Sequence, residues 1–540
     1  MPRASHTPAA TARTASAPSA PEPSPSVPVA AGLALGLDFG TTRTVVAAAD
    51  RGNYPLVNFE DAHGDSHTFI PSIVAEVDGA LVFGHEAATA ADGGAPAVES
   101  FKRLLATPEA GFSSTVTVGS VSVSLPDLLT AFFTHVREQL LTASSVRDIL
   151  ARDGFGPIAV GSPAHARSAQ RVLTLAALEA AGFATIRMFN EPSAAGFEYT
   201  HRHASSITSR RIRVLVYDLG GGTFDVSLID AAGLHHDVLA SSGSTSLGGA
   251  DFDAVLADLA LESAGLPRTS LDDASRAAVL RSARLAKEAI APQTRQVAIE
   301  LADGTAHVSV AEFYERATPL VERSLDILEP LVDLGEEADG GAQGADALAG
   351  ILVVGGASSL PLVARALRAR FGRRVRRSSQ PSGSTAVGLA IAADPTSEYR
   401  LTDRLSRGFG VFREAHGGAA SFHPIFDPDV TLGFDAPRFE HTYEAVHTVG
   451  HLRFMEYSSL DANGQPIGDL TPLTTVLVPY DPALQDGRDL AEVPVTALRR
   501  PRRFRETYSV SDAGVIVLEV TDLATGHTTV SRMTRGEQGD

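Results

Sequence analysis

Cysteine is absent from the 540-residue chain, and so are long apolar runs. Without a thiol, the chain can form no disulfide, no zinc-thiolate site and no cysteine nucleophile. No apolar run reaches the length of about 18 residues that a membrane-spanning helix needs, and the longest candidate, at 27–37, is interrupted by glycine. We therefore expect a cytoplasmic protein.

Lysine is almost absent as well, because only Lys102 and Lys287 are present among 45 basic residues. Lysine is a compact point charge and arginine a planar fork, so a site that needs one small cation beside a phosphoryl oxygen cannot easily exchange them. No glycine precedes either lysine, which excludes a Walker-type phosphate loop. The two lysines are therefore candidate site residues of another kind.

Acidic residues outnumber basic ones by 64 to 45, which gives a formal net charge of −19. Such a charge repels nucleic acid and anionic membranes, so we expect neither as a partner. A hydrophobic content of 44% and a charged content of 20% are typical of globular proteins, and the length allows more than one core.

Two glycine turns of the same design are the most informative motifs. The first is GLDFGTTRT at 36–44, and the second is DLGGGTFD at 218–225. In each, an apolar strand ends on an aspartate, turns through glycine and threonine, and continues as another apolar strand, which predicts a β-hairpin. Glycine lets backbone N–H groups approach an anion, threonine adds a hydroxyl, and the aspartates can hold a hydrated Mg²⁺. Two such turns predict a phosphate-binding cleft.

These turns, together with ILVVGGASSLP at 351–361, resemble the phosphate and adenosine motifs of the actin-like ATPase superfamily. Within it, four further segments resemble the heat shock protein 70 (DnaK-like) chaperones: SFKRLL at 100–105, GSPA at 161–164 leading to Gln170 and Arg171, NEPSAA at 190–195, and LGGADFD at 247–253. The resemblance covers 33–393 and continues more faintly to about 531. It implies an α/β fold: an actin-like (ribonuclease H-like), two-lobed nucleotide-binding domain followed by a β-sandwich-like domain.

Composition and pattern divide the chain into three parts. The Ala/Pro/Ser-rich tail 1–31 is expected to be disordered. Strands alternate with helical patterns in 32–395, the predicted nucleotide-binding domain. Helices are predicted at 125–143, 166–181, 252–264, 272–290, 310–334 and 361–371, and loops at 201–211 and 335–350.

The remaining part, 400–540, contains predicted strands at 474–478, 505–510 and 515–520, and we expect it to be a β-rich peptide-binding domain. The family places a helical lid beyond this domain, and the sequence ends at Asp540 without one, so we expect a lidless form. The segment 398–402 lacks the leucine-rich character with which the family docks its linker. We therefore expect weak coupling between the domains.

The resemblance assigns roles to matched positions. Asp38 and Asp218 would orient Mg²⁺, and Lys102 would place the attacking water. The implied catalytic residues are Lys102, Glu191, Thr223 and Asp225. The implied ATP-binding residues are Gly40, Thr41, Thr42, Gly220, Gly221, Gly222, Thr223, Gly248, Gly249, Lys287, Gly355, Gly356 and Ala357. Pro163 and Arg171 match a proline switch that passes the nucleotide state to the next domain.

The adenine side departs from the family pattern. Lys287 matches, whereas other residues occupy five of the family's positions here: Arg284, Glu288, Ala291, Ser359 and Ser382. Loss of a cation stacked on the base costs on the order of 1 kcal/mol. We expect ATP to bind more weakly and with less base selectivity than the family pattern implies.

The partners implied by the resemblance are unfolded or extended polypeptide clients and co-chaperones. Two other functions stay open: a nucleotide-binding actin-like scaffold or regulatory protein without client turnover, and a sugar-kinase-type phosphotransferase, which the GGADFD segment and the β domain disfavour. The histidine pairs 63/67, 201/203 and 235/236 have metal-like spacing, but we interpret them as solvated loop residues.

Overall fold

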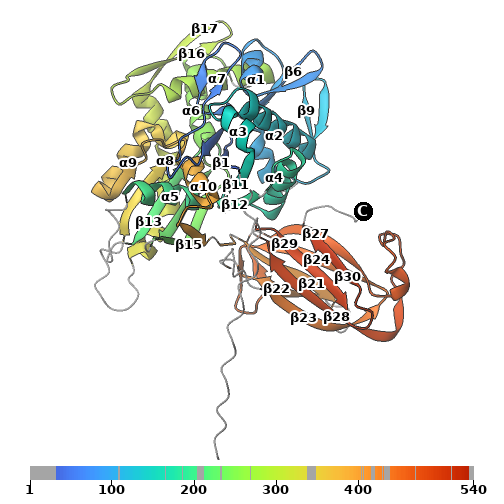
Figure 1. Ribbon diagram of the computed structural model, residues 1–540. Coiled ribbons are helices and arrows are strands. Elements are labelled where there is room, and N and C mark those ends of the chain that lie inside the picture. Colours follow the sequence, from blue (N-terminus) through green and yellow to red (C-terminus); the bar gives the residue numbers. More distant parts are fainter. Residues whose placement is uncertain are drawn as a thin grey trace, which may run out of the picture.

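The computed structural model describes residues 32–533, apart from 108–109, 165, 185, 204–211, 232–233, 268, 270, 337–347, 403, 406, 415–419, 428–429, 431–437, 469 and 512–513. The tail predicted at 1–31 and most of the loops predicted at 201–211 and 335–350 lie outside the described residues. Figure 1 shows a mixed helical and sheet region, followed by a β-rich region built from the end of the chain.

The first lobe is built on a five-stranded sheet that contains the first glycine turn. Its strands in spatial order are β12 (Ile186–Asn190), β11 (Phe155–Ser162), β1 (Leu33–Phe39), β2 (Arg43–Ala48) and β5 (Ile70–Pro71). β1 and β2 form the predicted antiparallel hairpin, and β11 and β12 extend it in parallel. The helices α2 (Leu125–Thr142), α3 (Arg147–Asp153) and α4 (Ser168–Ala180) belong to this lobe, and Phe132 and Phe133 of α2 are buried in its core.

Short elements complete the first lobe. They are β3 (Phe59–Glu60), β4 (Ser66–His67), β6 (Ile73–Val77), β7 (Ala80–Phe83), α1 (Gly84–Asp92), β8 (Ala97–Glu99), the 3₁₀ helix η1 (Phe101–Ala106), β9 (Thr115–Val118) and β10 (Val121–Ser124). The 3₁₀ helix η1 carries Lys102, whose side chain is buried.

The second lobe repeats the design around the second glycine turn. Its six-stranded sheet has the order β19 (Val375–Arg377), β18 (Leu348–Val354), β13 (Arg213–Leu219), β14 (Phe224–Asp230), β15 (His235–Ser244) and β20 (Arg400–Thr402). β13 and β14 form the predicted hairpin, and β18 lies parallel to β13. The other elements are α6 (Gly249–Ser263), α7 (Asp273–Glu288), β16 (Gln296–Leu301), β17 (Gly304–Ser309), α8 (Val310–Glu336), η4 (Gly356–Ser359), α9 (Pro361–Phe371) and η5 (Gly372–Arg374).

Two helices join the lobes at close range. α5 (Glu191–His203) packs on β13 and β14, whereas α10 (Ser384–Ala393) packs on β1 and β11, and the two helices pack on each other. A Cβ atom at Gly388 would lie 1.7 Å from the carbonyl oxygen of Ala194, so only glycine allows this contact. The close packing fixes the start of α5, and with it Glu191, at the boundary between the lobes.

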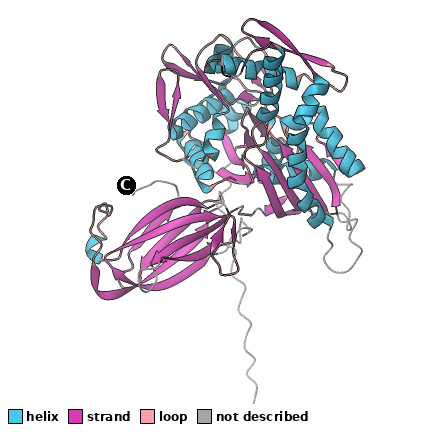
Figure 2. Cartoon of the chain, turned by 180° about the vertical axis from the view of Figure 1, so that it is seen from behind, coloured by secondary structure: helices cyan, strands magenta, loops and turns pink. Residues whose placement is uncertain are grey.

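The C-terminal region consists of two four-stranded antiparallel sheets, seen at the other end of the molecule in Figure 2. One has the order β22 (Ala420–Phe426), β21 (Gly408–Glu414), β24 (Val449–Tyr457) and β27 (Thr471–Pro479). The other has β23 (Phe439–His447), β28 (Ala497–Val510), β29 (Ile516–Asp522) and β30 (Thr528–Arg532). Smaller pieces are β25 (Ser459–Leu460), β26 (Pro466–Ile467) and η6 (Pro482–Leu484). Phe409, Phe454 and Tyr508 are among the residues of their shared core.

The connection between the regions contains a strand that pairs with the second lobe. β20 pairs in parallel with β15, with Leu401 opposite His236, and Leu401 and Tyr399 pack against hydrophobic clusters of the first region. The segment therefore docks without a leucine-rich sequence, and weak coupling between the domains stays a prediction. Strand pairing uses backbone N–H and C=O groups, which every residue except proline supplies, so a leucine-rich sequence is not required.

Three side chains add to the contact between the regions. The carboxylate of Glu456 on β24 accepts a hydrogen bond from the backbone N–H of Ser168 at 3.0 Å. Asn190 donates its side-chain amide to the carbonyl oxygen of Arg404 at 3.4 Å. Val515, in the turn between β28 and β29, belongs to the hydrophobic core of the first lobe. In the part of the chain that the structure describes, none of the helices combines the length and the apolar character needed to cross a bilayer.

Candidate nucleotide-binding cleft

A cavity between the two lobes brings together most residues predicted from the sequence. The predicted residues that line it are Asp38, Gly40, Thr41, Thr42, Lys102, Glu191, Asp218, Gly220, Gly221, Thr223, Gly249, Lys287, Gly355, Gly356 and Ala357. They come from strand ends, turns and helix starts of both lobes, so the cavity exists only because the lobes face each other.

The two glycine turns meet across this cavity. A Cβ atom at Gly221 would lie 2.8 Å from the methyl carbon of Thr42, and one at Gly222 would lie 2.8 Å from that of Thr41. Larger residues would push the turns apart. The glycines thus place threonine hydroxyls and backbone N–H groups of both lobes at one point, as an anion cradle requires.

Lys102 and Glu191 form a buried ion pair at the floor of the cavity. The Lys102 Nζ atom lies 2.7 Å from Glu191 Oε1, and the two side chains are only 7% and 11% exposed. The ammonium also lies 5.4 Å from the centre of the Phe39 ring. These contacts hold one compact cation beside both glycine turns.

Asp38 and Asp218 are the second-to-last residues of β1 and β13, and Asp218 is buried whereas Asp38 is half-buried. Burial and the charge of Glu191 raise the pKa of Asp38 to about 7, while Lys102 opposes the shift. Burial and the neighbouring carboxylates raise the pKa of Asp218 well above its ordinary value. Neighbouring carboxylates repel each other when both are ionised, so they can carry their charges at the same time only if a cation binds beside them.

A divalent cation would meet that need. Within the described residues, no three acidic or histidine side chains converge closely enough to cage an ion by themselves. This arrangement fits Mg²⁺, which keeps several of its waters and takes only one or two protein carboxylates. Asp38 and Asp218 are the residues that would hold it.

Three predicted residues, Gly222, Gly248 and Asp225, do not line the cavity. Asp225 is 4% exposed and accepts a hydrogen bond from the backbone N–H of Ala164 at 3.1 Å, which ties the second turn to the Pro163 segment. Burial raises the pKa of Asp225 to about 7.

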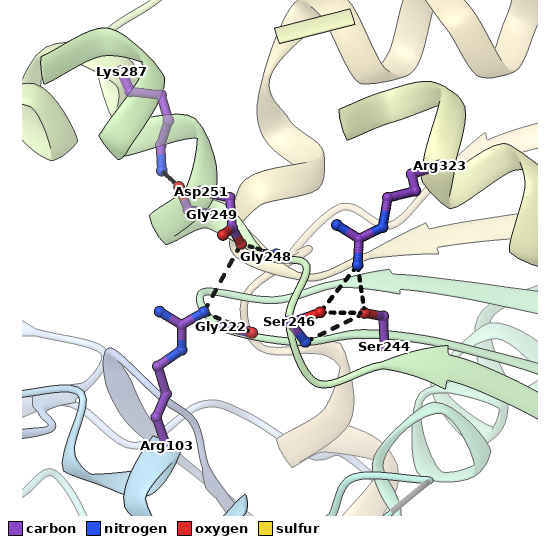
Figure 3. Close-up of polar contacts among 9 residues, drawn as sticks. All are labelled: Arg103, Gly222, Ser244, Ser246, Gly248, Gly249, Asp251, Lys287 and Arg323. Carbon is purple, nitrogen blue, oxygen red and sulfur yellow. Dashed lines mark hydrogen bonds and ion pairs between the residues drawn. The ribbon is translucent and has the colours of Figure 1, made fainter. Parts of the chain in front are cut away.

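Gly222 and Gly248 pack against each other just outside the cavity. A Cβ atom at Gly248 would lie 2.5 Å from the carbonyl carbon of Gly222. Figure 3 shows Arg103 reaching from the first lobe to this point, with its guanidinium 3.4 Å from the Gly222 carbonyl oxygen and 3.8 Å from Asp251. These glycines therefore shape the second turn, and their contact with a nucleotide stays a prediction.

The far end of the cavity is held by Lys287. Its Nζ atom donates to the carbonyl oxygen of Gly249 at 2.8 Å (Figure 3) and lies 2.6 Å from Asp253. Burial raises the pKa of Asp253 and lowers that of Lys287, and their mutual attraction opposes both shifts.

Two residues that depart from the family pattern make contacts within the protein. Arg284 pairs with Glu99 of the first lobe at 2.8 Å. Ser359 accepts a hydrogen bond from Arg377 at 2.6 Å.

Some lining residues were not in the predicted set. They are Arg43, Val45, Asp253, Arg284, Glu288, Pro381, Ser382 and Thr385. Arg43 belongs to the GLDFGTTRT motif and Asp253 to the LGGADFD motif. Both could have been predicted if every residue of these motifs had been counted as a candidate. Pro381 lies in the connection before α10 and carries no local signal.

The histidine pairs are only partly as expected. His236 is fully buried on β15, so its assignment to a solvated loop is wrong. His235 and His201 are exposed as predicted, but His235 lies in β15, His201 and His203 lie in α5, and His67 lies in β4 rather than in loops. No metal-binding group of three acidic or histidine residues is found among the described residues.

Two lobes of the same design, with glycine turns facing across a cleft, define the fold of an actin-like ATPase domain. Comparison with known proteins agrees with this class. Residues 145–403 match the family model described as Hsp70 protein. The chain therefore carries an Hsp70-family domain, as the motifs indicated.

The chain is similar to chaperone proteins of Escherichia. The chain is 33% identical to the chaperone protein HscA of Escherichia coli O6:H1 over 406 residues, which cover 72% of this chain and 62% of that protein. It is also 33% identical to the HscA protein of Escherichia fergusonii over 407 residues, with the same coverage. The chain thus matches less than two thirds of the length of these relatives.

Proposed function

We propose that this protein binds ATP with Mg²⁺ in the cleft, hydrolyses it, and acts as a chaperone on extended polypeptides. The observation that carries the proposal is the buried Lys102–Glu191 pair beside two facing glycine turns and two aspartates that line the cavity. Phosphoryl transfer requires positioning and charge stabilisation rather than covalent chemistry, and this arrangement supplies both.

Each part of the cavity would have its own role. Backbone N–H groups and hydroxyls of the two turns would bind the phosphates, and Asp38 and Asp218 would hold hydrated Mg²⁺. Lys102 would orient the attacking water and stabilise charge on the transferred phosphoryl group, with Glu191 fixing the ammonium. Thr223 lines the cavity at the second turn, and Asp225 would support the turn from behind.

We place the boundary between the nucleotide-binding domain and the C-terminal region at about 395–400. The C-terminal region, 400–540, is the proposed peptide-binding domain. Two open four-stranded sheets offer edges to which an extended client can add a strand. Co-chaperones are the other proposed partners. The lidless form and the cytoplasmic location remain predictions, because the relatives are longer than this chain.

The second candidate is a nucleotide-binding scaffold or regulatory protein without client turnover. The adenine side favours it, since Glu288 and Ser382 line the cavity where the family pattern has other residues and Ser359 is engaged by Arg377. Weak binding and low base selectivity remain our expectation for this end, to be tested by calorimetry with ATP and GTP.

Replacement of Lys102 tests the proposal. We expect Lys102→Ala to slow single-turnover hydrolysis by about 100-fold or more while ATP binding changes little, because the ammonium acts mainly on the transition state. Arg51→Ala is the matched control, since Arg51 is exposed in the same lobe and pairs with Asp50. A wild-type rate in Lys102→Ala would refute the catalytic role. Stimulation of the wild-type rate by an unfolded peptide would favour the chaperone over the scaffold.

A further inference from the structure

Arg43 joins the two lobes at the cavity wall. It is the first residue of β2 and directly follows Thr41 and Thr42 of the first turn. Its guanidinium carbon lies 4.6 Å from the centre of the Phe69 ring, and its Nη2 atom makes an ion pair with Glu288, the last residue of α7. A cation on the first phosphate turn is therefore held by a carboxylate of the opposite lobe.

This pair differs from those of the other cations that line the cavity. Lys102 and Lys287 are both 7% exposed and pair with enclosed carboxylates. Arg284 is held by Glu99 at 2.8 Å. Arg43 and Glu288 are 34% and 39% exposed, and an exposed ion pair contributes at most about 1 kcal/mol. Among these cations, Arg43 can exchange its partner at the lowest cost.

Carboxylates outnumber cations among the residues that line the cavity, by five to four. Asp38, Asp218 and Glu191 line it, and Lys102 is the buried cation among them. A polyphosphate adds further negative charge to these carboxylates. Arginine suits the missing contact, because its fork binds phosphate oxygens in bidentate geometry. The Phe69 ring already aligns the guanidinium beside the turn.

We propose that Arg43 binds the phosphate chain of the nucleotide and that Glu288 competes with the phosphate for it. This inference rests on the proposed function and adds a phosphate-binding residue to it. Nucleotide entry exchanges a contact between the lobes for a contact between Arg43 and the ligand. The two partners of the ion pair then have opposite effects: removal of Arg43 weakens phosphate binding, and removal of the Glu288 charge strengthens it.

The test is calorimetry on the full chain with MgATP and with adenosine. We expect Arg43→Ala to weaken MgATP binding by about 10-fold, in the range of a lost charge-assisted hydrogen bond, and to leave adenosine binding unchanged. Glu288→Gln should tighten MgATP binding by a few-fold. Arg43→Lys should restore part of the loss, because it keeps the charge without the fork. Arg51→Ala is the control for removal of an arginine from the first lobe, and thermal melting checks that each variant folds.

Two results would overturn the inference. If Arg43→Ala and Glu288→Gln both weaken MgATP and adenosine alike, the pair is only a clamp between the lobes. If Arg43→Ala binds MgATP as wild type does, Arg43 does not contact phosphate, although the proposed function survives. Failure of the wild-type protein to bind MgATP at all would instead refute the proposed function itself.

Discussion

Single residues decide the chemistry of the cleft because so few cations are present in it. Both lysines of the chain line the cavity, each against an enclosed carboxylate. Arginine fills all other basic positions of the chain. Lysine at 102 is therefore expected to be required as a compact ammonium, since a guanidinium would not fit between Glu191 and the Phe39 ring.

The same crowding predicts the behaviour of Asp218. We expect Asp218→Asn to weaken Mg²⁺-dependent ATP binding by about 10-fold, because one of the two carboxylates that would hold the hydrated ion is lost. Binding without Mg²⁺ should stay equal or improve, since a negative charge near the phosphates is removed. Titration of Mg²⁺ at fixed nucleotide measures both effects, and superimposable curves for wild type and variant would contradict the assignment.

At the level of elements, helix α4 is capped from another domain. Arg167 at its N-cap position makes no side-chain capping bond, and Glu456 of β24 instead accepts from both the N–H and the hydroxyl of Ser168. A carboxylate at a helix N-terminus satisfies a free N–H group and the helix dipole. One turn later, Arg171 bonds to Asn190, which also contacts Arg404.

We expect Glu456→Ala to destabilise the docked arrangement by about 1–2 kcal/mol, the range for loss of an N-cap. Limited trypsin digestion at Arg400, Arg404 and Arg407 should report it as faster cleavage of the linker. Glu440→Ala, at an exposed position of β23, is the matched control. Equal cleavage rates for wild type and Glu456→Ala would show that the cap does not hold the domains together.

His236 makes the β15–β20 contact sensitive to acid. Its ring is fully buried, and within the described residues neither ring nitrogen has a hydrogen-bond partner. Phe197, Tyr399, His235 and Asp237 surround it, and burial lowers its pKa from 6.5 to about 4. Between these pH values the unfolded chain binds the proton and the folded chain does not, so stability falls as pH drops from 6.5 to 4.

The His236→Phe variant should lose this part of the pH dependence. The contribution is up to roughly 3 kcal/mol, at 1.36 kcal/mol per pKa unit. Thermal melting at pH 7 and pH 4.5 measures it, and we expect a smaller drop for His236→Phe than for wild type. His235→Ala, at an exposed neighbouring position, is the control. An unchanged drop in His236→Phe would assign the acid sensitivity to other groups.

For the whole molecule, local sequence patterns predicted a large part of the structure. Both glycine hairpins, the six predicted helices and the three predicted C-terminal strands are present, because the signals of each lie within a few neighbouring residues. The contacts between distant segments were not predictable in this way. The Arg43–Glu288 pair, the Glu456 cap and the pairing of β20 with β15 depend on which surfaces meet, and no local pattern encodes that.

At the scale of the whole molecule, the linker docks on the second lobe through β20. Leu401 packs opposite His236, so Leu401→Asp would place a charge in an apolar contact and should release β20. We expect the radius of gyration from small-angle X-ray scattering to increase in this variant. Arg400→Ala, at an exposed position of the same strand, is the control. A scattering curve identical to wild type would show that other contacts suffice.

The position of β20 at the end of the six-stranded sheet has a consequence for fragments of the protein. Without this strand, the backbone N–H and C=O groups of β15 at 235–237 would face solvent beside the apolar ring of Phe197. Unpaired strand edges are templates for aggregation and for exchange of strands between copies. A nucleotide-binding fragment cut before residue 400 is therefore expected to self-associate through this edge. A fragment that extends past Thr402 keeps β20, which pairs with the edge of β15 and covers it.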